Sequence, residues 1–168
     1  MSARVRATAR PRPTARRPAA SRRASAAPSA GSRSGRPTPR DLIREADRAR
    51  RRAYAPYSDF PVGAALLTRQ GRVIHGCNVE NASYGLCVCA ERTALWKALI
   101  EGESEFTAIA VTARQGHGAP PCGACRQVLF EFAPRLWVYW RDGRGRILRR
   151  RLVELLAMPF VLRTRRRA

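Results

Sequence analysis

The sequence predicts an α/β domain in which strands and helices form stacked layers. Short apolar runs typical of strands alternate along the chain with segments whose apolar residues recur at helical spacing. The chain has 168 residues, of which 45% are hydrophobic, so it can form one domain with a substantial core and is not wholly disordered. Its apolar runs fall well short of the roughly 18 residues that a membrane span needs, so we expect no membrane association of this kind.

The first half of the domain is predicted to contain one helix and a hairpin. The helix begins at Thr38-Pro39, because threonine can cap a helix and proline suits its first position. Apolar residues then recur at helical spacing until Pro56: they are Leu42, Ile43, Ala46, Ala49 and Ala53. Two short apolar runs, 62–68 and 73–79, flank a polar turn and predict a pair of strands.

The second half is predicted to continue the alternation of helices and strands. The elements are a helix over 89–100, a strand over 106–112, a helix over 123–132, and strands over 136–140 and 147–153. Because a helix connects the strands at 106–112 and 136–140, we expect these two strands to be parallel.

The positive charge of +21 lies mainly outside the predicted core. Residues 1–40 contain eleven arginines, six prolines and no acidic residue, residues 163–168 add four arginines, and the stretch 141–151 carries a net +5. The N-terminal segment could be an arm that binds nucleic acid or an anionic surface, a transit peptide, or a solvated extension. Its prolines disfavour the helix of a transit peptide, so we predict a disordered extension at 1–37, a domain at 38–162 and a basic tail at 163–168.

Two cysteine-containing segments predict a metal site. The sequence Cys-Ala-Glu at 89–91 and the sequence Pro-Cys-Gly-Ala-Cys at 121–125 each stand at the start of a predicted helix, where thiolates are favoured. Three thiolates, from Cys89, Cys122 and Cys125, could hold zinc and leave a fourth position for water. Glu91 would then lie beside this position and could transfer protons without being a ligand.

A closed, purely structural zinc site is the alternative. Its fourth ligand could come from Cys77, Cys87, His75 or His117. The Cys-Ala-Glu segment favours the open site, since the pattern of three ligands, a non-ligand glutamate and Pro-Cys-x-x-Cys is typical of zinc deaminases. We therefore expect Cys77 and Cys87 to be buried or half-buried free thiols, and neither histidine to be catalytic.

Four segments in unbroken order resemble the cytidine deaminase family in its small homotetrameric form. They are Ala-Pro-Tyr-Ser-Asp-Phe-Pro-Val-Gly at 55–63, Gly-Cys-Asn-Val-Glu-Asn-Ala-Ser-Tyr at 76–84, Cys-Ala-Glu-Arg-Thr-Ala at 89–94 and Pro-Cys-Gly-Ala-Cys-Arg-Gln at 121–127. The resemblance covers about residues 40–160. It implies a three-layer α/β/α domain around a five-stranded mixed sheet.

The resemblance also implies roles for individual residues in metal binding and catalysis. It makes Cys89, Cys122 and Cys125 the ligands of one Zn²⁺ per subunit and Glu91 the proton shuttle. Arg92 would donate to the ligand sulfurs and offset their negative charge.

Further residues are implied to hold the nucleoside. Asn78, Val79 and Glu80 match the segment that binds the ribose hydroxyls, the backbone of Ala90 would meet the pyrimidine edge, and Phe60 would wall the base pocket.

Tyr84 and Phe160 match positions that reach a neighbouring subunit's active site in the family. The family ending usually reads Leu-Leu-Pro-x-x-Phe, whereas here the proline is Pro159, directly before Phe160. The resemblance therefore implies active sites that are shared between subunits. The different position of the proline implies a changed backbone beside the Phe160 ring.

The implied activity is zinc-dependent hydrolysis of cytidine and deoxycytidine to uridine and deoxyuridine with release of ammonia, in pyrimidine salvage, by a cytoplasmic homotetramer. Nucleic acid is expected to bind only weakly, through the basic tail. The alternatives are a deaminase of cytosine in RNA or DNA, a related deaminase of a nucleoside-like antibiotic, and a non-catalytic zinc module that binds nucleic acid through its basic tail.

Overall fold

The computed structural model describes residues 35–114, 118 and 120–162. Most of the predicted extension, His117 and the terminal arginines at 163–168 lie outside these residues. The predicted helices and strands occur in the predicted order, and the structure adds the short helices η1 and α4. The elements are α1 Pro39–Arg50, β1 Gly63–Thr68, β2 Val73–Cys77, η1 Tyr84–Leu86, α2 Ala90–Ile100, β3 Phe106–Thr112, α3 Gly123–Phe132, β4 Trp137–Arg141, β5 Ile147–Arg151 and α4 Leu152–Leu155. No described helix has the length and apolarity needed to cross a membrane.

The five strands form one mixed sheet in the order β2-β1-β3-β4-β5. β1 is antiparallel to both β2 and β3, and β4 is antiparallel to β5. β3 and β4 are parallel, with α3 in the connection between them, which confirms the prediction from sequence.

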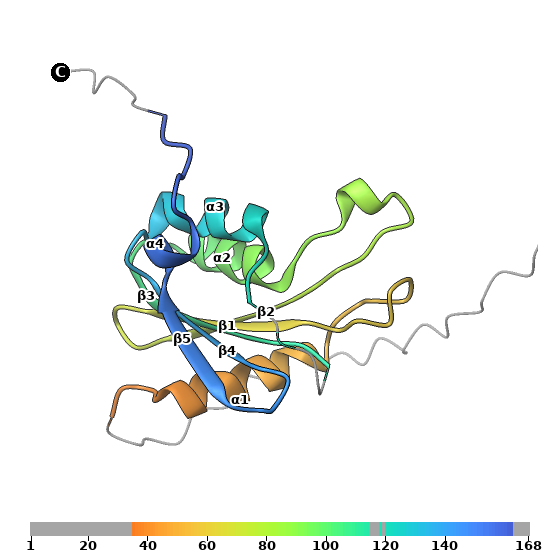
Figure 1. Ribbon diagram of the computed structural model, residues 1–168, viewed down its shortest axis with the longest axis horizontal. Helices are drawn as coiled ribbons and strands as arrows, with labels where there is room; N and C mark the ends of the chain where they lie inside the picture. The colour runs from red at the N-terminus through yellow and green to blue at the C-terminus, as the bar shows by residue number, and fades with distance from the viewer. Residues whose placement is uncertain (1–34, 115–117, 119, 163–168) are drawn as a thin grey trace, which may run out of the picture. The chain divides into compact units, whose positions relative to one another are not determined.

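Helices cover the sheet on both sides and produce three layers, as predicted (Figure 1). α1 packs on one face, where its Leu42 and Ile43 meet Ala65 and Leu67 of β1. α2 and α3 lie on the other face together with the short α4, and this second core includes Leu66. Every residue of β1 is buried, because successive side chains enter opposite cores.

Two glycines allow helix backbone to approach the sheet closely. A Cβ on Gly76 of β2 would lie 2.3 Å from the Ala90 carbonyl oxygen and 2.4 Å from the Ala94 nitrogen of α2. A Cβ on Gly63 of β1 would lie 2.1 Å from the Ala46 carbonyl oxygen of α1. The N-terminal turn of α2 therefore rests directly on the backbone of β2.

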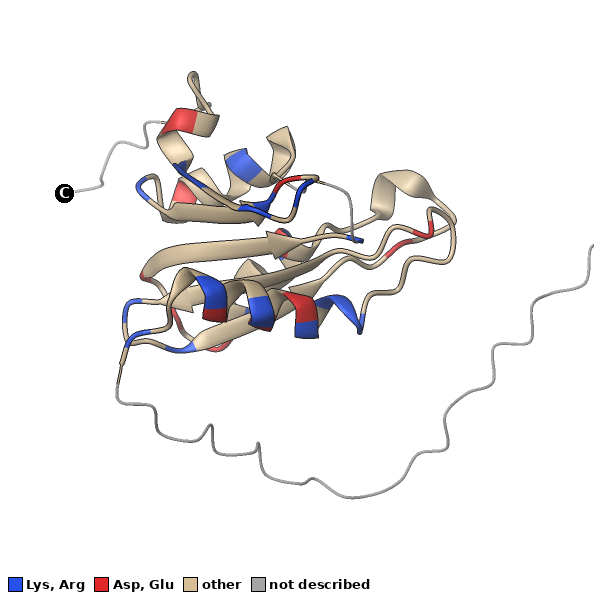
Figure 2. Ribbon diagram, turned by 60° about the horizontal axis from the view of Figure 1, so that its bottom comes forward, with Lys and Arg blue, Asp and Glu red and all other residues tan. Residues whose placement is uncertain are grey.

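The N-terminus of α1 has the predicted threonine cap. The Thr38 hydroxyl accepts from the Asp41 backbone N–H at 3.2 Å, and the Asp41 carboxylate accepts from the Thr38 backbone N–H at 3.0 Å. The hydrogen bonds from Thr38 and Arg44 lower the pKa of Asp41 to about 2. The outward face of α1 alternates in charge, and Arg44 and Arg48 are paired with acidic residues of the same helix (Figure 2).

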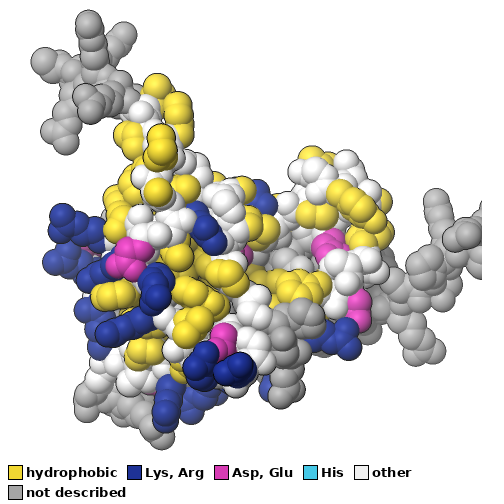
Figure 3. All heavy atoms as spheres, viewed as in Figure 1, with side chains coloured by type: hydrophobic (Ala, Val, Ile, Leu, Met, Phe, Trp, Pro, Cys, Tyr) yellow, Lys and Arg dark blue, Asp and Glu magenta, His cyan; other side chains and the backbone are white. Residues whose placement is uncertain are grey.

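The edge strand β5 carries a different charge pattern. In the view of Figure 3, Lys and Arg side chains gather over β5 with hydrophobic side chains between them. Arg149 and Arg151 alternate with Arg150 along the strand, and both stack on the Trp137 ring of β4, at 5.2 and 3.8 Å from its centroid. This face of β4 and β5 belongs to the α1 side of the sheet, because Trp137 and Ile147 pack against the core that α1 contributes to.

Candidate active site

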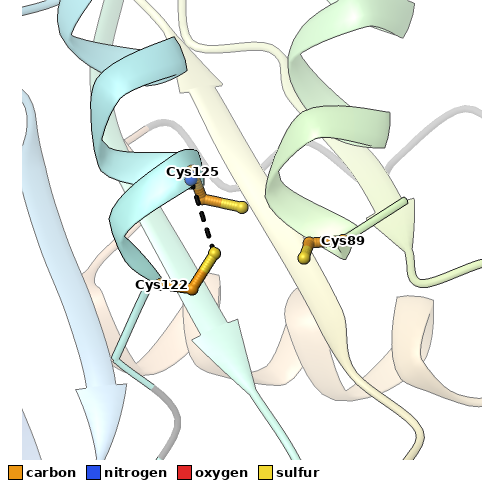
Figure 4. A group of neighbouring side chains, drawn as sticks. All are labelled: Cys89, Cys122 and Cys125. Atoms are coloured by element: carbon orange, nitrogen blue, oxygen red, sulfur yellow. Dashed lines mark hydrogen bonds between the residues drawn. The ribbon is translucent and has the colours of Figure 1, made fainter. Parts of the chain in front are cut away.

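Three cysteine sulfurs meet between α2 and α3 (Figure 4). Cys89 is the N-cap of α2, Cys122 is the N-cap of α3, and Cys125 lies in the first turn of α3. Their Sγ atoms all lie within 4.8 Å of one another. The Cys125 backbone N–H donates to the Cys122 Sγ at 3.5 Å, so a helix N-terminus faces this sulfur.

Electrostatics at the cluster favour the thiolate form of Cys89. A hydrogen bond from the Cys125 thiol, together with the Arg92 guanidinium, lowers the pKa of Cys89 to about 5. The Arg92 Nη2 atom lies 3.5 Å from the Cys89 Sγ and 3.3 Å from the Cys87 carbonyl oxygen, in the position expected for a donor to the sulfurs. The pKa of Cys125 is raised because its thiol is the donor in this arrangement and is desolvated.

Glu91 lies beside the sulfurs and is almost completely buried, with 4% of its surface exposed. Burial is the main reason that its pKa is raised, and the negative charge of Cys89 adds to the effect. A carboxyl whose pKa moves upward toward neutral pH is suited to taking and giving protons.

A cavity of about 510 Å³ opens onto this group. It is lined by Cys89, Cys122 and Glu91, together with three of the residues that were predicted to contact substrate: Phe60, Asn78 and Glu80. A volume of this size suits a small organic molecule. The structure therefore places two of the clustered cysteines, the buried carboxyl of Glu91 and the polar side chains of Asn78 and Glu80 around one cavity.

Asn78 and Glu80 also fix the loop that carries Phe60. The Asn78 amide accepts from the Val62 N–H at 2.7 Å and donates to the Phe60 carbonyl at 3.1 Å. The Glu80 carboxylate accepts from the backbone N–H groups of Tyr57 and Ser58 and from the Ser58 hydroxyl, which lowers its pKa. Both side chains thus border the cavity and support its wall.

The other predicted contact residues are not part of the lining of this cavity. Val79 pairs through its backbone with Val88, and 44% of its surface is exposed. Ala90 is buried in the first turn of α2. Tyr84 and Phe160 point away from the core, with 73% and 71% of their surfaces exposed.

The structure adds two residues that sequence reasoning did not single out. Gln127 on α3 donates to the Phe160 carbonyl at 2.8 Å and accepts from the Phe160 N–H at 2.9 Å. The neighbouring Arg126 donates to the carbonyls of Pro121 and Leu155 and thereby ties the Cys122 loop to the end of α4. The sequence feature that could have identified Arg126 and Gln127 is their place in the Cys-Arg-Gln sequence at 125–127.

Among the residues that the structure describes, three of the four proposed fourth ligands of a closed zinc site have other partners. The Cys77 thiol donates to the Arg52 carbonyl at 3.3 Å, the Cys87 sulfur contacts the backbone of Asn81, and His75 lies 2.9 Å from Glu45. Within the part of the chain that the structure describes, only Cys89, Cys122 and Cys125 form a group able to hold a metal. Cys77 and Cys87 are half-buried free thiols, as expected.

These residues fit a zinc ion with an open position. Two helix N-termini and Arg92 favour negative charge on the sulfurs, as a thiolate ligand set requires. The cavity beside Cys89 and Cys122 leaves room for a reacting molecule, and Glu91 faces the same cavity without belonging to the sulfur cluster.

Comparison with known proteins agrees with this geometry. Residues 37–141 match the family model described as the cytidine and deoxycytidylate deaminase zinc-binding region. A cytidine deaminase of Halalkalibacterium halodurans is 54% identical over 120 residues, which span 71% of this chain and 91% of that protein. A blasticidin-S deaminase of Bacillus cereus is 28% identical, over 59% of this chain and 76% of that protein.

A solved structure is similar over nearly all of its length. The crystal structure of cytidine deaminase from Burkholderia pseudomallei has 52% sequence identity and a TM-score of 0.70, and the match covers 73% of this chain and 99% of that one. The chain therefore belongs to the cytidine and deoxycytidylate deaminase family and carries its zinc-binding region.

Proposed function

We propose that this protein is a zinc-dependent cytidine deaminase that converts cytidine and deoxycytidine to uridine and deoxyuridine with release of ammonia. The observation that carries the proposal is the buried Glu91 beside the sulfur cluster on a cavity that also presents Glu80 and Phe60. Much higher identity to a cytidine deaminase than to a blasticidin-S deaminase favours cytidine as the substrate.

Proton transfer is assigned to the Glu91 carboxyl. It takes one proton from the attacking water and gives it to N3 of the cytosine ring, and it then takes the second proton from the oxygen added at C4 and gives it to the amino group, which leaves as ammonia. Its raised pKa suits a group that must act as base and then as acid. A zinc ion held by Cys89, Cys122 and Cys125 supplies, when bound, the Lewis acidity that activates the attacking water.

The sugar is assigned to Asn78 and Glu80. A carboxylate and an amide at the rim can pair with sugar hydroxyls, since one accepts and the other both accepts and donates. A 3′-phosphodiester would place a second negative charge against Glu80, so the substrate is a free nucleoside and not a base within a strand.

Assembly and location belong to the same proposal. Tyr84 and Phe160 are large, exposed side chains, and the hydrogen bonds from Gln127 fix the backbone of Phe160. This supports a homotetramer in which these rings complete neighbouring active sites. Three closely spaced thiols stay reduced in the cytoplasm, which supports a cytoplasmic role in pyrimidine salvage.

The test is an ultraviolet assay of purified full-length protein. We expect turnover of cytidine and deoxycytidine, little turnover of cytidine 5′-monophosphate, and none of a single-stranded oligonucleotide that contains cytosine. A chelator should abolish the activity, and added Zn²⁺ should restore it. Faster conversion of the oligonucleotide than of cytidine would favour the polynucleotide deaminase instead, and no turnover of any substrate would favour the non-catalytic zinc module.

A further inference from the structure

A second cavity, of about 710 Å³, lies beside the N-terminal end of α1 and the first residues of β3 and β4. Its walls are largely apolar and include Trp137 and Tyr139. Three arginines also line it, Arg36, Arg135 and Arg151, whereas its described lining contains no aspartate or glutamate. The cavity therefore combines aromatic surface with positive charge.

The arginines around this cavity have no acidic partners in the described structure, and two of them lie over the Trp137 ring. Arg151 stacks on Trp137 and donates to the Arg135 carbonyl at 2.6 Å, and Arg149 stacks on the same ring. In the described structure, none of Arg36, Arg135, Arg149 and Arg151 forms an ion pair. By contrast, Arg44 and Arg48 on α1 each pair with a carboxylate.

This surface is well separated from the active site. The second cavity meets β3 at 106–108, at the start of the strand, whereas the active-site cavity meets it at Val111, near the strand's end. Among the described lining residues, the two cavities share none. A ligand in one cavity therefore leaves the other accessible.

We propose that this basic and aromatic cavity, with the adjoining face of β5, binds single-stranded nucleic acid. Guanidinium groups without acidic partners pair with phosphates, and the planes of Arg149 and Arg151, which lie over Trp137, provide stacking surfaces for unpaired bases. The apolar wall offers space for a splayed base. Bases bound here lie away from Glu91 and are not deaminated.

Charge indicates an extended polyanion as the occupant. The positive charge continues beyond the cavity along 141–151, with a net +5, and nine arginines precede Gly35 in the sequence. A mononucleotide can engage only a few of these charges, whereas a strand can engage many.

The experiment measures binding of a fluorescein-labelled oligouridylate of about 15 nucleotides by full-length protein. Oligouridylate is the probe because uracil cannot be deaminated. The test variant is Arg135→Gln/Arg149→Gln, and the matched control is Arg44→Gln/Arg48→Gln, which removes the same charge from the outer face of α1. We expect the test variant to bind about fivefold to tenfold more weakly. The slope of log K against log salt concentration, measured between about 50 and 200 mM, should become shallower by about 1.4, or about 0.7 for each lost phosphate contact. The control should bind nearly as the parent does.

Three comparisons decide the outcome. Cytidine turnover should be equal in the parent, test and control proteins, which shows that folding and the active site are intact. Saturating cytidine should not displace the strand, which shows that the strand binds outside the active site. Arg135→Lys/Arg149→Lys should bind between the parent and the glutamine variant, because it keeps the charge and loses the planar groups. Equal weakening of the test and control variants, full binding by the lysine variant, or tighter binding to anionic phospholipid vesicles than to the strand would each overturn the proposal.

Discussion

At the residue scale, Glu91 is the side chain whose chemistry differs most from that of an ordinary surface carboxylate, because 96% burial is uncommon for this residue type. We expect Glu91→Gln to lose activity by a factor of at least about 10²–10⁴ while it keeps its zinc, since the change removes proton transfer and no sulfur ligand. Steady-state kinetics and metal analysis on the same sample measure both effects.

The control for this change is Glu101→Gln, which removes a carboxylate outside the active-site cavity that pairs with Arg72. It should keep both zinc and turnover. Substantial activity in Glu91→Gln would show that another group transfers the protons.

A second residue-scale prediction separates the ligand cysteines from the other thiols. Cys122→Ala should lose zinc and lower the melting temperature, because a thiolate set with one member missing binds metal weakly. Cys77→Ala should keep about one zinc per chain, since this thiol donates to the Arg52 carbonyl and does not belong to the sulfur cluster. Metal content by mass spectrometry under native conditions tests the pair, and zinc loss from Cys77→Ala would require a different ligand set.

The sequence allowed prediction of the groups whose chemistry depends on local spacing. Cys122 and Cys125 share one helical turn, and Cys89 and Glu91 are two residues apart at another helix start. The contacts that support the cavity could not be predicted in the same way. Ser58 meets Glu80 across 22 residues of sequence and Gln127 meets Phe160 across 33, so only the folded chain brings them together.

At the element scale, the close approach of α2 to β2 makes Gly76 a sensitive position. Gly76→Ala should destabilise the protein by more than about 3 kcal/mol, the upper end for an overpacked core, because the new methyl group meets backbone that cannot rotate away. The displacement affects the helix turn that carries Glu91, so kcat should fall as well. Denaturant unfolding and kinetics at a temperature where the variant is folded measure the two effects.

Two other glycines serve as controls for this prediction. Gly63→Ala presses on α1, on the opposite face of the sheet, and should cost stability with a smaller effect on kcat in the folded fraction. Gly85→Ala meets nothing within 4 Å and should leave both quantities unchanged. Equal loss of kcat in the Gly63 and Gly76 variants would contradict the special role of α2.

Element ends were less predictable than element types. The predicted helix extends to Ala53, but α1 ends at Arg50, and the predicted strand at 147–153 is a strand only to Arg151. Leu152 begins α4 because its side chain is completely buried in the core beside α2 and α3, a tertiary contact that an alternating pattern does not encode. The short helix η1 was likewise not predicted.

At the scale of the whole molecule, the charged N-terminal segment can be tested separately from the domain. Residues 1–34 contain only Met1 and Val5 as large apolar side chains. A chain that begins at Gly35 should therefore fold, assemble and deaminate cytidine with unchanged kcat/KM. It keeps Arg36 and the Thr38 cap of α1.

The same truncated chain should bind oligouridylate more weakly and with a smaller salt slope, because nine arginines are removed. Size-exclusion chromatography with light scattering, run beside the kinetics, supplies the control for assembly. A dissociated oligomer or a large fall in kcat/KM would show that the segment contributes to the enzyme itself.

The positions of the sulfur ligands at two helix starts also affect how the chain resists local opening. Cys89 and Cys122 are 33 residues apart, and the chain between them contains α2 and β3, the strand at the centre of the sheet. A zinc ion that joins both ends converts this stretch into a closed ring and removes loop entropy from any partly opened form. Amide hydrogens of β3 should therefore exchange with solvent more slowly in the zinc-loaded protein than after chelation, while those of the distant edge strand β5 should change little.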